Sequence, residues 1–423
     1  MADEVGRVND LLLPPHTRLF HIGPHKTGTT ALQGAAHARR EELLEHGVRY
    51  PGRTFNHRVA VNAFMGRGFG WMVDGEKSTP APSYKKWQAL KDEMERDHER
   101  RFLFGHEYAS SAEEEHIVGW AKDLGPSLHV VITLRAYSRM LPSLWQETLK
   151  RNAGRMGYEK WLRNVLKPEE VGLPGRKVRF DHSYLISRWA QELGPERVTV
   201  VALDPADHAF VFHAFEDMLG LPREMLASAN PADQAINRSM STPEAELFRR
   251  LNMATRELGL EWPNHEWLDY HGALSRVVAT RTPSKDEPKL RLPDWALDLG
   301  YAEELKIVQT ITDTGVNLIG DSAHLVAGDK KPKAPYIDHR DIAEVPIDLA
   351  VTAMVGVIAA ATGREAVSFE RTPASMMRKT RTDTQFNGAP KVVAQTSTRL
   401  IDEVKIRVKR RWRDLTRRLR RSK

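Results

Sequence analysis

The residues best suited to chemistry form one run near the start of the chain, from Leu19 to Thr30 (LFHIGPHKTGTT). An apolar segment enters a loop bounded by Gly23 and Gly28, and a helical pattern begins at Thr29. Backbone N–H groups at the start of a helix point outward, and the helix dipole favours an anion there. The run therefore predicts a phosphate-binding loop, in which Lys26 supplies the positive charge.

The loop differs from that of nucleoside triphosphatases in the position of its lysine. It has the spacing G-x-x-x-x-G, but Thr29 follows the second glycine where those enzymes have Lys. Thr30 keeps the hydroxyl position, and Asp204 ends an apolar run that could resemble a metal-binding strand. An ATP-dependent small-molecule kinase is therefore an alternative interpretation, and an ordinary strand-to-helix turn is another.

The run Ile22–Thr30 resembles a known family. It is similar to the 5′-phosphosulfate loop of sulfotransferases that use 3′-phosphoadenosine 5′-phosphosulfate (PAPS), in particular heparan sulfate N-sulfotransferase domains and their bacterial relatives. Four further features agree in order, and two of them are as follows. Arg135 ends the apolar run Val130–Leu134 and Ser143 follows eight residues later, and Phe102–Glu107 resembles the strand end that carries an acidic base in the heparan-type branch.

The resemblance implies the donor, its contacts and the reaction. PAPS would donate a sulfuryl group to an acceptor without a metal ion, and Arg135 and Ser143 would hold its 3′-phosphate. Lys26 would lie near the bridging oxygen, where negative charge grows during transfer. The residues that would bind the 5′-phosphosulfate are Gly23, Lys26, Thr27, Gly28, Thr29 and Thr30.

The acceptor must lose a proton as it attacks, and the sequence offers several bases. Glu107 is the first candidate, and His57 and His106 are the alternatives, because an unperturbed histidine titrates in the useful range. Gln146, Lys150 and Arg151 follow Ser143 on one predicted helix and would face a polar acceptor. We expect a carbohydrate or lipid-linked acceptor that receives the group on a hydroxyl in first place and an amine in second. A non-catalytic nucleotide-binding or membrane-surface scaffold is the alternative from a different class.

Strand and helix patterns alternate over the first half of the chain, which predicts an α/β fold. The fold class is a P-loop-like, mostly parallel sheet flanked by helices, with a mainly helical C-terminal part. The predicted strands are Arg18–Ile22, Arg101–Phe104, His129–Leu134 and Val198–Leu203. The predicted helices include Thr29–His46, Tyr137–Arg151, Ser183–Leu193, Ala209–Leu219, Ala245–Leu258, Glu303–Thr314 and Ile347–Ala361.

Composition shifts along the chain divide it into four predicted parts. Residues 1–230 form the PAPS-binding α/β core, and residues 231–365 are a helical continuation of the same domain. Residues 366–398 have few large apolar side chains and are predicted to be a linker or an irregular wrap. Residues 399–423 have apolar residues at helical spacing among many Lys and Arg, which predicts a basic amphipathic helix.

The overall charge excludes one class of function. The chain has 423 residues and a net charge of +7, but Lys405 to Lys423 has eleven Lys and Arg against one Asp, so this tail carries +10 and the rest carries −3. Specific nucleic-acid binding is therefore not expected of the body. The absence of cysteine excludes disulfides, thiolate zinc sites and cysteine nucleophiles.

The termini and the longest apolar run bear on location. The N-terminus lacks the basic and then hydrophobic layout of a signal peptide, so we expect a cytoplasmic protein. Ile347 to Ala361 is shorter than the roughly 20 residues needed to span a bilayer and is expected to be a buried helix. The basic tail at 399–423 predicts peripheral contact with the anionic inner membrane face. Docking on the protein's own acidic body, non-specific nucleic-acid contact and an inert solubilising tail are the alternatives.

Overall fold

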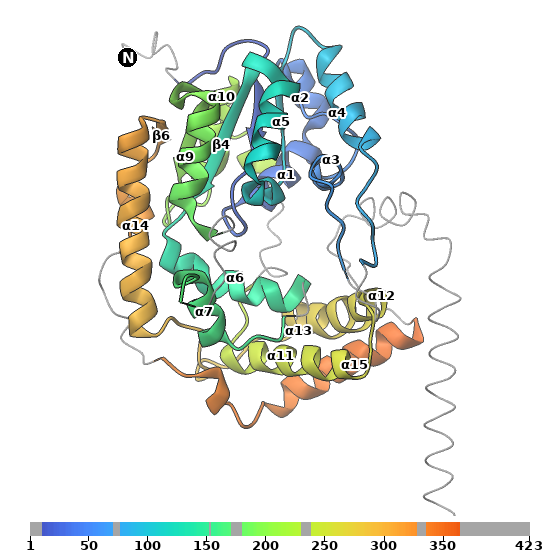
Figure 1. Ribbon diagram of the computed structural model, residues 1–423. Coiled ribbons are helices and arrows are strands. Elements are labelled where there is room, and N and C mark those ends of the chain that lie inside the picture. The colour runs from blue at the N-terminus through green and yellow to red at the C-terminus, as the bar shows by residue number, and fades with distance from the viewer. Residues whose placement is uncertain are drawn as a thin grey trace, which may run out of the picture. The chain divides into compact units, whose positions relative to one another are not determined.

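The computed structural model describes residues 11–70, 77–151, 154–170, 180–229, 238–327 and 336–363, and these fall into two compact units (Figure 1). Within these ranges the first unit holds residues 11–229, 239–259 and 283–345, and the second holds residues 238, 260–282 and 346–363. The predicted linker at 366–398 and the predicted amphipathic helix at 399–423 lie outside the described residues. The expected boundaries at 230, 365 and 398 stay predictions.

The first unit is built on a six-stranded sheet in which all described pairings are parallel, which confirms the predicted fold class. The strand order is β2-β3-β1-β4-β5-β6. The strands are β1 Arg18–His21, β2 Val48–Arg49, β3 Arg101–Gly105, β4 Leu128–Leu134, β5 Val198–Ala202 and β6 Asn317–Ile319. The two edge strands β2 and β6 are the shortest and have no counterpart in the sequence prediction. Because every strand runs the same way, the loops that follow the strands meet at one edge of the sheet.

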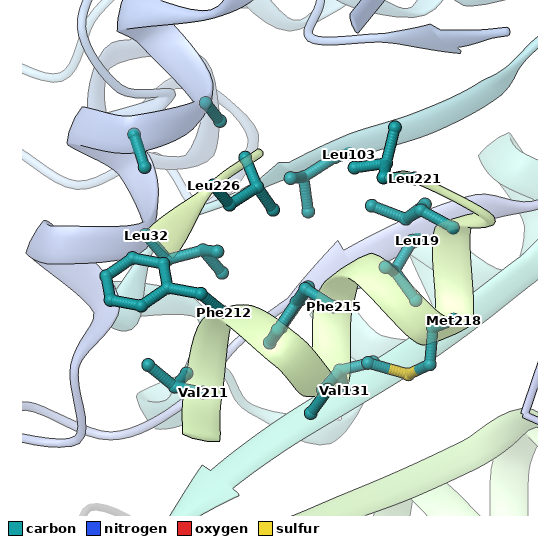
Figure 2. Close-up of a cluster of buried hydrophobic side chains, with 14 of the residues drawn as sticks. Leu19, Leu32, Leu103, Val131, Val211, Phe212, Phe215, Met218, Leu221 and Leu226 are labelled. Atoms are coloured by element: carbon teal, nitrogen blue, oxygen red, sulfur yellow. The ribbon is translucent and has the colours of Figure 1, made fainter. Parts of the chain in front are cut away.

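One face of the sheet packs on α1 (Thr29–Ala38) and α10 (Phe210–Leu219). Figure 2 shows Leu19, Leu103 and Val131 beneath the side chains of α10. Leu19 lies opposite Leu103 in the register of β1 and β3, so both side chains point to the same face. The apolar residues at this period of two form the core beneath the loop that follows β1.

The other face packs on α5 (Glu114–Leu124) and α9 (His182–Leu193), through an aromatic cluster. The ring of Phe20 stacks on Phe104 at 4.9 Å and meets the edge of Trp120 at 5.0 Å. Trp189 stacks on Trp120 at 6.1 Å and is fully buried, so its side chain belongs to the core. Helices on both faces make a three-layer α/β/α sandwich, in which the strands are buried on both sides.

The predicted helices are present in the structure, with changed boundaries. The expected helix Thr29–His46 is two helices, α1 and α2 (Arg40–Glu45), because the backbone leaves the helical region at Arg39, where ψ is 19°. The remaining helices of the first unit are α3 Arg58–Phe64, α4 Lys85–Glu95, α6 Tyr137–Arg151, α7 Tyr158–Leu166, α11 Thr242–Glu257 and α14 Asp294–Thr314.

The long helix α14 runs beside α9 and α6 (Figure 1) and supports the start of α6. The fully buried carboxylate of Glu304 accepts hydrogen bonds from the backbone N–H (2.8 Å) and the hydroxyl (2.6 Å) of Ser138. Its second oxygen accepts from the backbone N–H of Ala327 at 2.8 Å. A carboxylate at a helix N-terminus is favoured by the helix dipole, so α14 fixes the position of α6 although the two are far apart in sequence.

The second unit is a small group of helices. It consists of α12 Trp262–His265, the π-helix Glu266–Leu274, α13 Ser275–Thr280 and α15 Ile347–Thr362. The backbones of α15 and the π-helix approach closely, since a Cβ on Gly356 would lie 2.4 Å from the carbonyl oxygen of Gly272. Arg281 donates to Asp348 at 2.6 Å, and the indole of Trp267 donates to the carbonyl of Ala360 at 2.9 Å.

The expectation that Ile347–Ala361 is a buried helix is wrong for one of its faces. Leu349, Ala353, Gly356 and Ala360 are buried, but the opposite side of α15 is exposed, with Ile347 82 % accessible. Its other exposed apolar residues are Val351, Met354, Val355 and Ile358. The described helices of its unit pack on the buried side alone. No helix among the described residues is long and apolar enough to cross a membrane.

Candidate active site around the loop after β1

The predicted phosphate loop follows β1 in the middle of the sheet, between the loops that follow β3 and β4. The chain leaves β1 toward β2 and leaves β4 toward β5, so the strand order reverses between β1 and β4. Ligands of open parallel sheets bind in the crevice at such a switch point, outside the carboxyl ends of the strands. The topology thus places Lys26, after β1, and Arg135, after β4, on adjacent loops at this edge of the sheet.

Buried polar side chains of β1 and β4 form hydrogen bonds that fix the loop to the sheet. Thr133 of β4 is bonded to His21 Nε2 and to the hydroxyl of Thr27, both at 2.9 Å, and that hydroxyl donates to the carbonyl of Pro24 at 2.6 Å. A Cβ on Gly23 would lie 2.0 Å from Thr133 Oγ1, so only glycine fits there. Burial lowers the pKa of His21 to about 3, and its ring is therefore neutral.

The backbone of the loop turns sharply at Lys26 and Gly28. Both residues have positive φ, 71° for Lys26 and 82° for Gly28, which costs little for glycine but is a strained conformation for lysine. Arg135 Nη1 donates to the carbonyl of Lys26 at 3.4 Å. The Lys26 ammonium lies 2.6 Å from Glu147 Oε2 on α6. Strain held in place by such contacts is characteristic of functional loops.

The start of α1 offers backbone donors to an anion. Gly28 precedes the helix and has no side chain with which to cap it, and the first turn contains no acidic residue. The Thr29 hydroxyl is buried and points to the Gly23 carbonyl at 3.4 Å, whereas Thr30 is exposed. Of the threonines named for the 5′-phosphate, Thr27 and Thr29 therefore offer backbone N–H groups, and Thr30 also offers a hydroxyl to a bound group.

Glu107 begins the short 3₁₀ turn that follows β3 and lies between two histidines. Its Oε1 is 3.7 Å from His25 Nδ1, and its Oε2 is 3.3 Å from His106 Nε2. His106 Nδ1 accepts a hydrogen bond from the backbone of Tyr108, so the ring proton is assigned to Nε2. Nε2 of the buried His106 is the ring nitrogen nearer to the carboxylate. The structure thus brings His106 next to Glu107, and its role as a base stays a prediction.

Both ring nitrogens of His57, which was predicted as an alternative base, are bonded to the backbone. Nδ1 accepts from the backbone N–H of Gly105 at 3.2 Å, so Nε2 carries the proton and donates it to the carbonyl of Pro51 at 2.9 Å. The ring is buried, and desolvation lowers the pKa of His57 to about 4. His57 is a structural residue that fixes the end of β3 just before Glu107.

The other predicted site residues lie on α6 and differ in burial and in their partners. Gln146 is buried and both donates to and accepts from the backbone of Met240, at 3.2 Å and 2.8 Å. The structure therefore bonds the amide of Gln146, which was predicted as an acceptor contact, to Met240. Ser143 and Lys150 are half-buried on the same helix, and Arg151 is its last residue. Trp145 is buried and donates to the carbonyl of Met156 at 3.0 Å, so its side chain takes part in packing.

The structure also brings together residues that sequence reasoning missed. His25 and Glu147 pair with Glu107 and Lys26, so each of two carboxylates faces one residue of the loop. His25 stands inside the quoted motif, and its type alone could have marked it. Glu147 carried no local signal, because its partner lies 121 residues away in the sequence. Within the described ranges no group of three His, Cys, Asp or Glu could hold a metal ion.

Comparisons with known proteins add one likeness of fold. No family model matches the chain, and no curated protein matches it. A solved structure of a sulfotransferase from Alicyclobacillus acidocaldarius is similar to 57 % of this chain and 94 % of its own, with 15 % identity and a TM-score of 0.36. A likeness of this size assigns no function, so the functional argument rests on the site itself.

Proposed function

We propose that the protein is a sulfotransferase that moves a sulfuryl group from PAPS to a hydroxyl of its acceptor. The observation that carries the proposal is the grouping of Lys26, Arg135 and Glu107 around the uncapped start of α1, at the switch point of the sheet. Two cations and a row of backbone N–H groups suit a donor with phosphate groups, and the carboxylate suits an acceptor proton.

The residues act by position and charge. The 5′-phosphate would be held by backbone N–H groups at the start of α1 and by the Thr30 hydroxyl. Lys26 would stabilise the leaving oxygen. Arg135 with Ser143 would bind the 3′-phosphate. In the transfer the acceptor oxygen forms a bond to sulfur while the bond from sulfur to the bridging phosphate oxygen breaks, and Glu107 takes the acceptor proton. The products are the sulfated acceptor and 3′-phosphoadenosine 5′-phosphate.

The position of Asp204 argues against the kinase alternative. Asp204 follows β5, which is two strands from β1, and neighbouring strands lie about 4.8 Å apart. Its Oδ1 accepts from the backbone N–H of Ala206 at 2.7 Å and so caps its own turn. The strands that flank β1 end instead in Glu107 and Arg135. The residue that follows β4 is therefore an arginine, which cannot act as a ligand of a metal ion.

Calorimetry with 3′-phosphoadenosine 5′-phosphate and with ATP, both in EDTA, tests the donor. We expect the bisphosphate to bind more tightly than ATP, and Arg135→Ala to weaken its binding about 10- to 100-fold, because a charge-assisted hydrogen bond is lost. Lys26→Ala should weaken bisphosphate binding less and abolish transfer. Preference for ATP with Mg²⁺ would overturn the proposal. Bisphosphate binding without turnover over a panel of acceptors would favour the non-catalytic scaffold.

We further propose that the acceptor is a carbohydrate or lipid-linked molecule and that the protein works at the anionic inner face of a membrane. The +10 charge of residues 405–423 supports this, because each basic residue near an anionic surface contributes about 1 kcal/mol. The exposed apolar side of α15, defined above, is a second feature that suits the boundary of headgroups and acyl chains.

Co-sedimentation with vesicles of phosphatidylcholine, with and without phosphatidylserine, tests the membrane proposal. The full chain should pellet only with phosphatidylserine present, and a chain that ends at Arg399 should stay in solution. The double variant Met354→Glu/Ile358→Glu should reduce pelleting without changing secondary structure, because both side chains are exposed. Equal pelleting of the full and shortened chains would refute the role of residues 400–423.

A further inference from the structure

The ion pair between Lys26 and Glu147 is a contact that the proposed reaction does not use. The ammonium of Lys26 lies 2.6 Å from Glu147 Oε2, and the two side chains are 29 % and 16 % exposed. Exposed ion pairs contribute little, but a pair withdrawn from water interacts more strongly. The one lysine of the phosphate loop is thus held by a carboxylate from α6.

Both partners are fixed by contacts of their own. The backbone of Lys26 has its strained positive φ and its carbonyl accepts from Arg135. Glu147 follows Gln146, whose amide is bonded in both directions to Met240. The carboxylate therefore sits on a helix that cannot rotate without breaking buried hydrogen bonds. The ion pair is therefore part of the folded site, and an anionic donor that binds Lys26 must compete with Glu147 for the ammonium.

We infer that Glu147 is a positioning residue that acts through Lys26, holding the ammonium back from the ground-state donor and yielding it as charge grows on the leaving oxygen. This inference rests on the proposed function. A contact that strengthens only in the transition state raises turnover, whereas equal binding of ground state and transition state does not. Because the ammonium has three N–H donors, it can form a hydrogen bond to an oxygen of growing negative charge before its bond to the carboxylate breaks.

The inference predicts a split between affinity and turnover. Glu147→Gln removes a negative charge beside the donor, so it should tighten the binding of 3′-phosphoadenosine 5′-phosphate about tenfold. The same change should lower both KM for the donor and kcat. The reason is that the Lys26 ammonium would then contact the donor already in the ground state, so this contact would no longer favour the transition state alone. Glu115→Gln, which changes a 78 % exposed carboxylate, is the matched control and should alter neither quantity.

A double-mutant cycle tests the inference. Calorimetry of the full chain and of Glu147→Gln, Lys26→Ala and the double variant would use the bisphosphate and, separately, inorganic pyrophosphate. The effect of Glu147→Gln should disappear when Lys26 is already Ala. An equal effect in both backgrounds, unchanged affinity, or no binding of pyrophosphate by any variant would overturn the inference. If pyrophosphate shows the coupling but the bisphosphate binds no better than ATP, the inference stands and the proposed donor is wrong.

Discussion

The two compact units use their buried groups in different ways. In the first unit, polar side chains bond to one another and to the backbone beneath the loop, as in the chain from His21 through Thr133 to Thr27. In the second unit, two helices approach through Gly272 and Gly356, and the outer side of α15 is apolar. The difference teaches that substitutions beneath the loop of the first unit should alter charge and position at the site, whereas those at the contact of Gly272 with Gly356 should alter packing.

The largest expected effect is on turnover in the first unit. Glu107→Gln should lower kcat about 10²- to 10⁴-fold, because the amide cannot accept the acceptor proton. The melting temperature should hardly change, because the amide has nearly the shape of the carboxylate. Steady-state sulfuryl transfer measures the first quantity and thermal unfolding the second. Glu115→Gln is the control, and activity of Glu107→Gln close to that of the control would remove Glu107 from the proposed chemistry.

A matched pair of glycine substitutions compares the two units directly. Gly23→Ala and Gly356→Ala each place a Cβ within 2.5 Å of an oxygen, Thr133 Oγ1 in one case and the carbonyl of Gly272 in the other. We expect each to lower the free energy of unfolding by about 2–3 kcal/mol. Only Gly23→Ala should also abolish binding of the bisphosphate. Urea unfolding and calorimetry measure the two effects, and equal loss of binding in both variants would contradict the division.

The smallest expected effect is the pH dependence of the first unit. Desolvation lowers the pKa of His57, His129 and His182 to about 4 each, so these rings stay neutral in the folded protein. In the unfolded chain they titrate near 6.5, so the unfolded state binds more protons below that pH. Stability should therefore fall as the pH drops from about 6.5 toward 4.

Between pH 7 and pH 6 the loss should be below about 1 kcal/mol for each histidine. Urea midpoints across this range measure it. His129→Gln keeps a group that can bond to Thr199 and should flatten the profile. If the profile of His129→Gln matched that of the unchanged protein, His129 would not contribute to the loss of stability at low pH.

The sequence predicted the fold well where the pattern was strong. The four central strands have apolar runs with clear ends, and the structure moves their boundaries by one or two residues. The edge strands β2 and β6 were missed because two or three residues carry no periodicity, and their pairing with β3 and β5 is set by the tertiary fold. The exposed side of α15 was missed because apolar composition does not show how many neighbours a helix has.

The site divides along the same line. The phosphate loop could be found from the sequence because its glycines, lysine and threonines are contiguous. The partners of His57 and Gln146 could not be predicted, because Pro51 and Gly105 for the one and Met240 for the other come together with them only in the folded chain. Glu147 was overlooked for the same reason. A polar residue in a helical pattern says nothing of what it faces.

The buried Glu304 has a consequence for the newly made chain. Residues of the loop leave the ribosome early, but α6 gains its buried cap only when α14 has been synthesised, and the cap is complete only after Ala327. Domains generally fold as units during synthesis. A nascent chain that stops near residue 230 would contain every residue proposed for the chemistry and still lack the carboxylate that holds α6 in place. Such a chain would depend on chaperones, and the protein would become competent only in the last stage of translation.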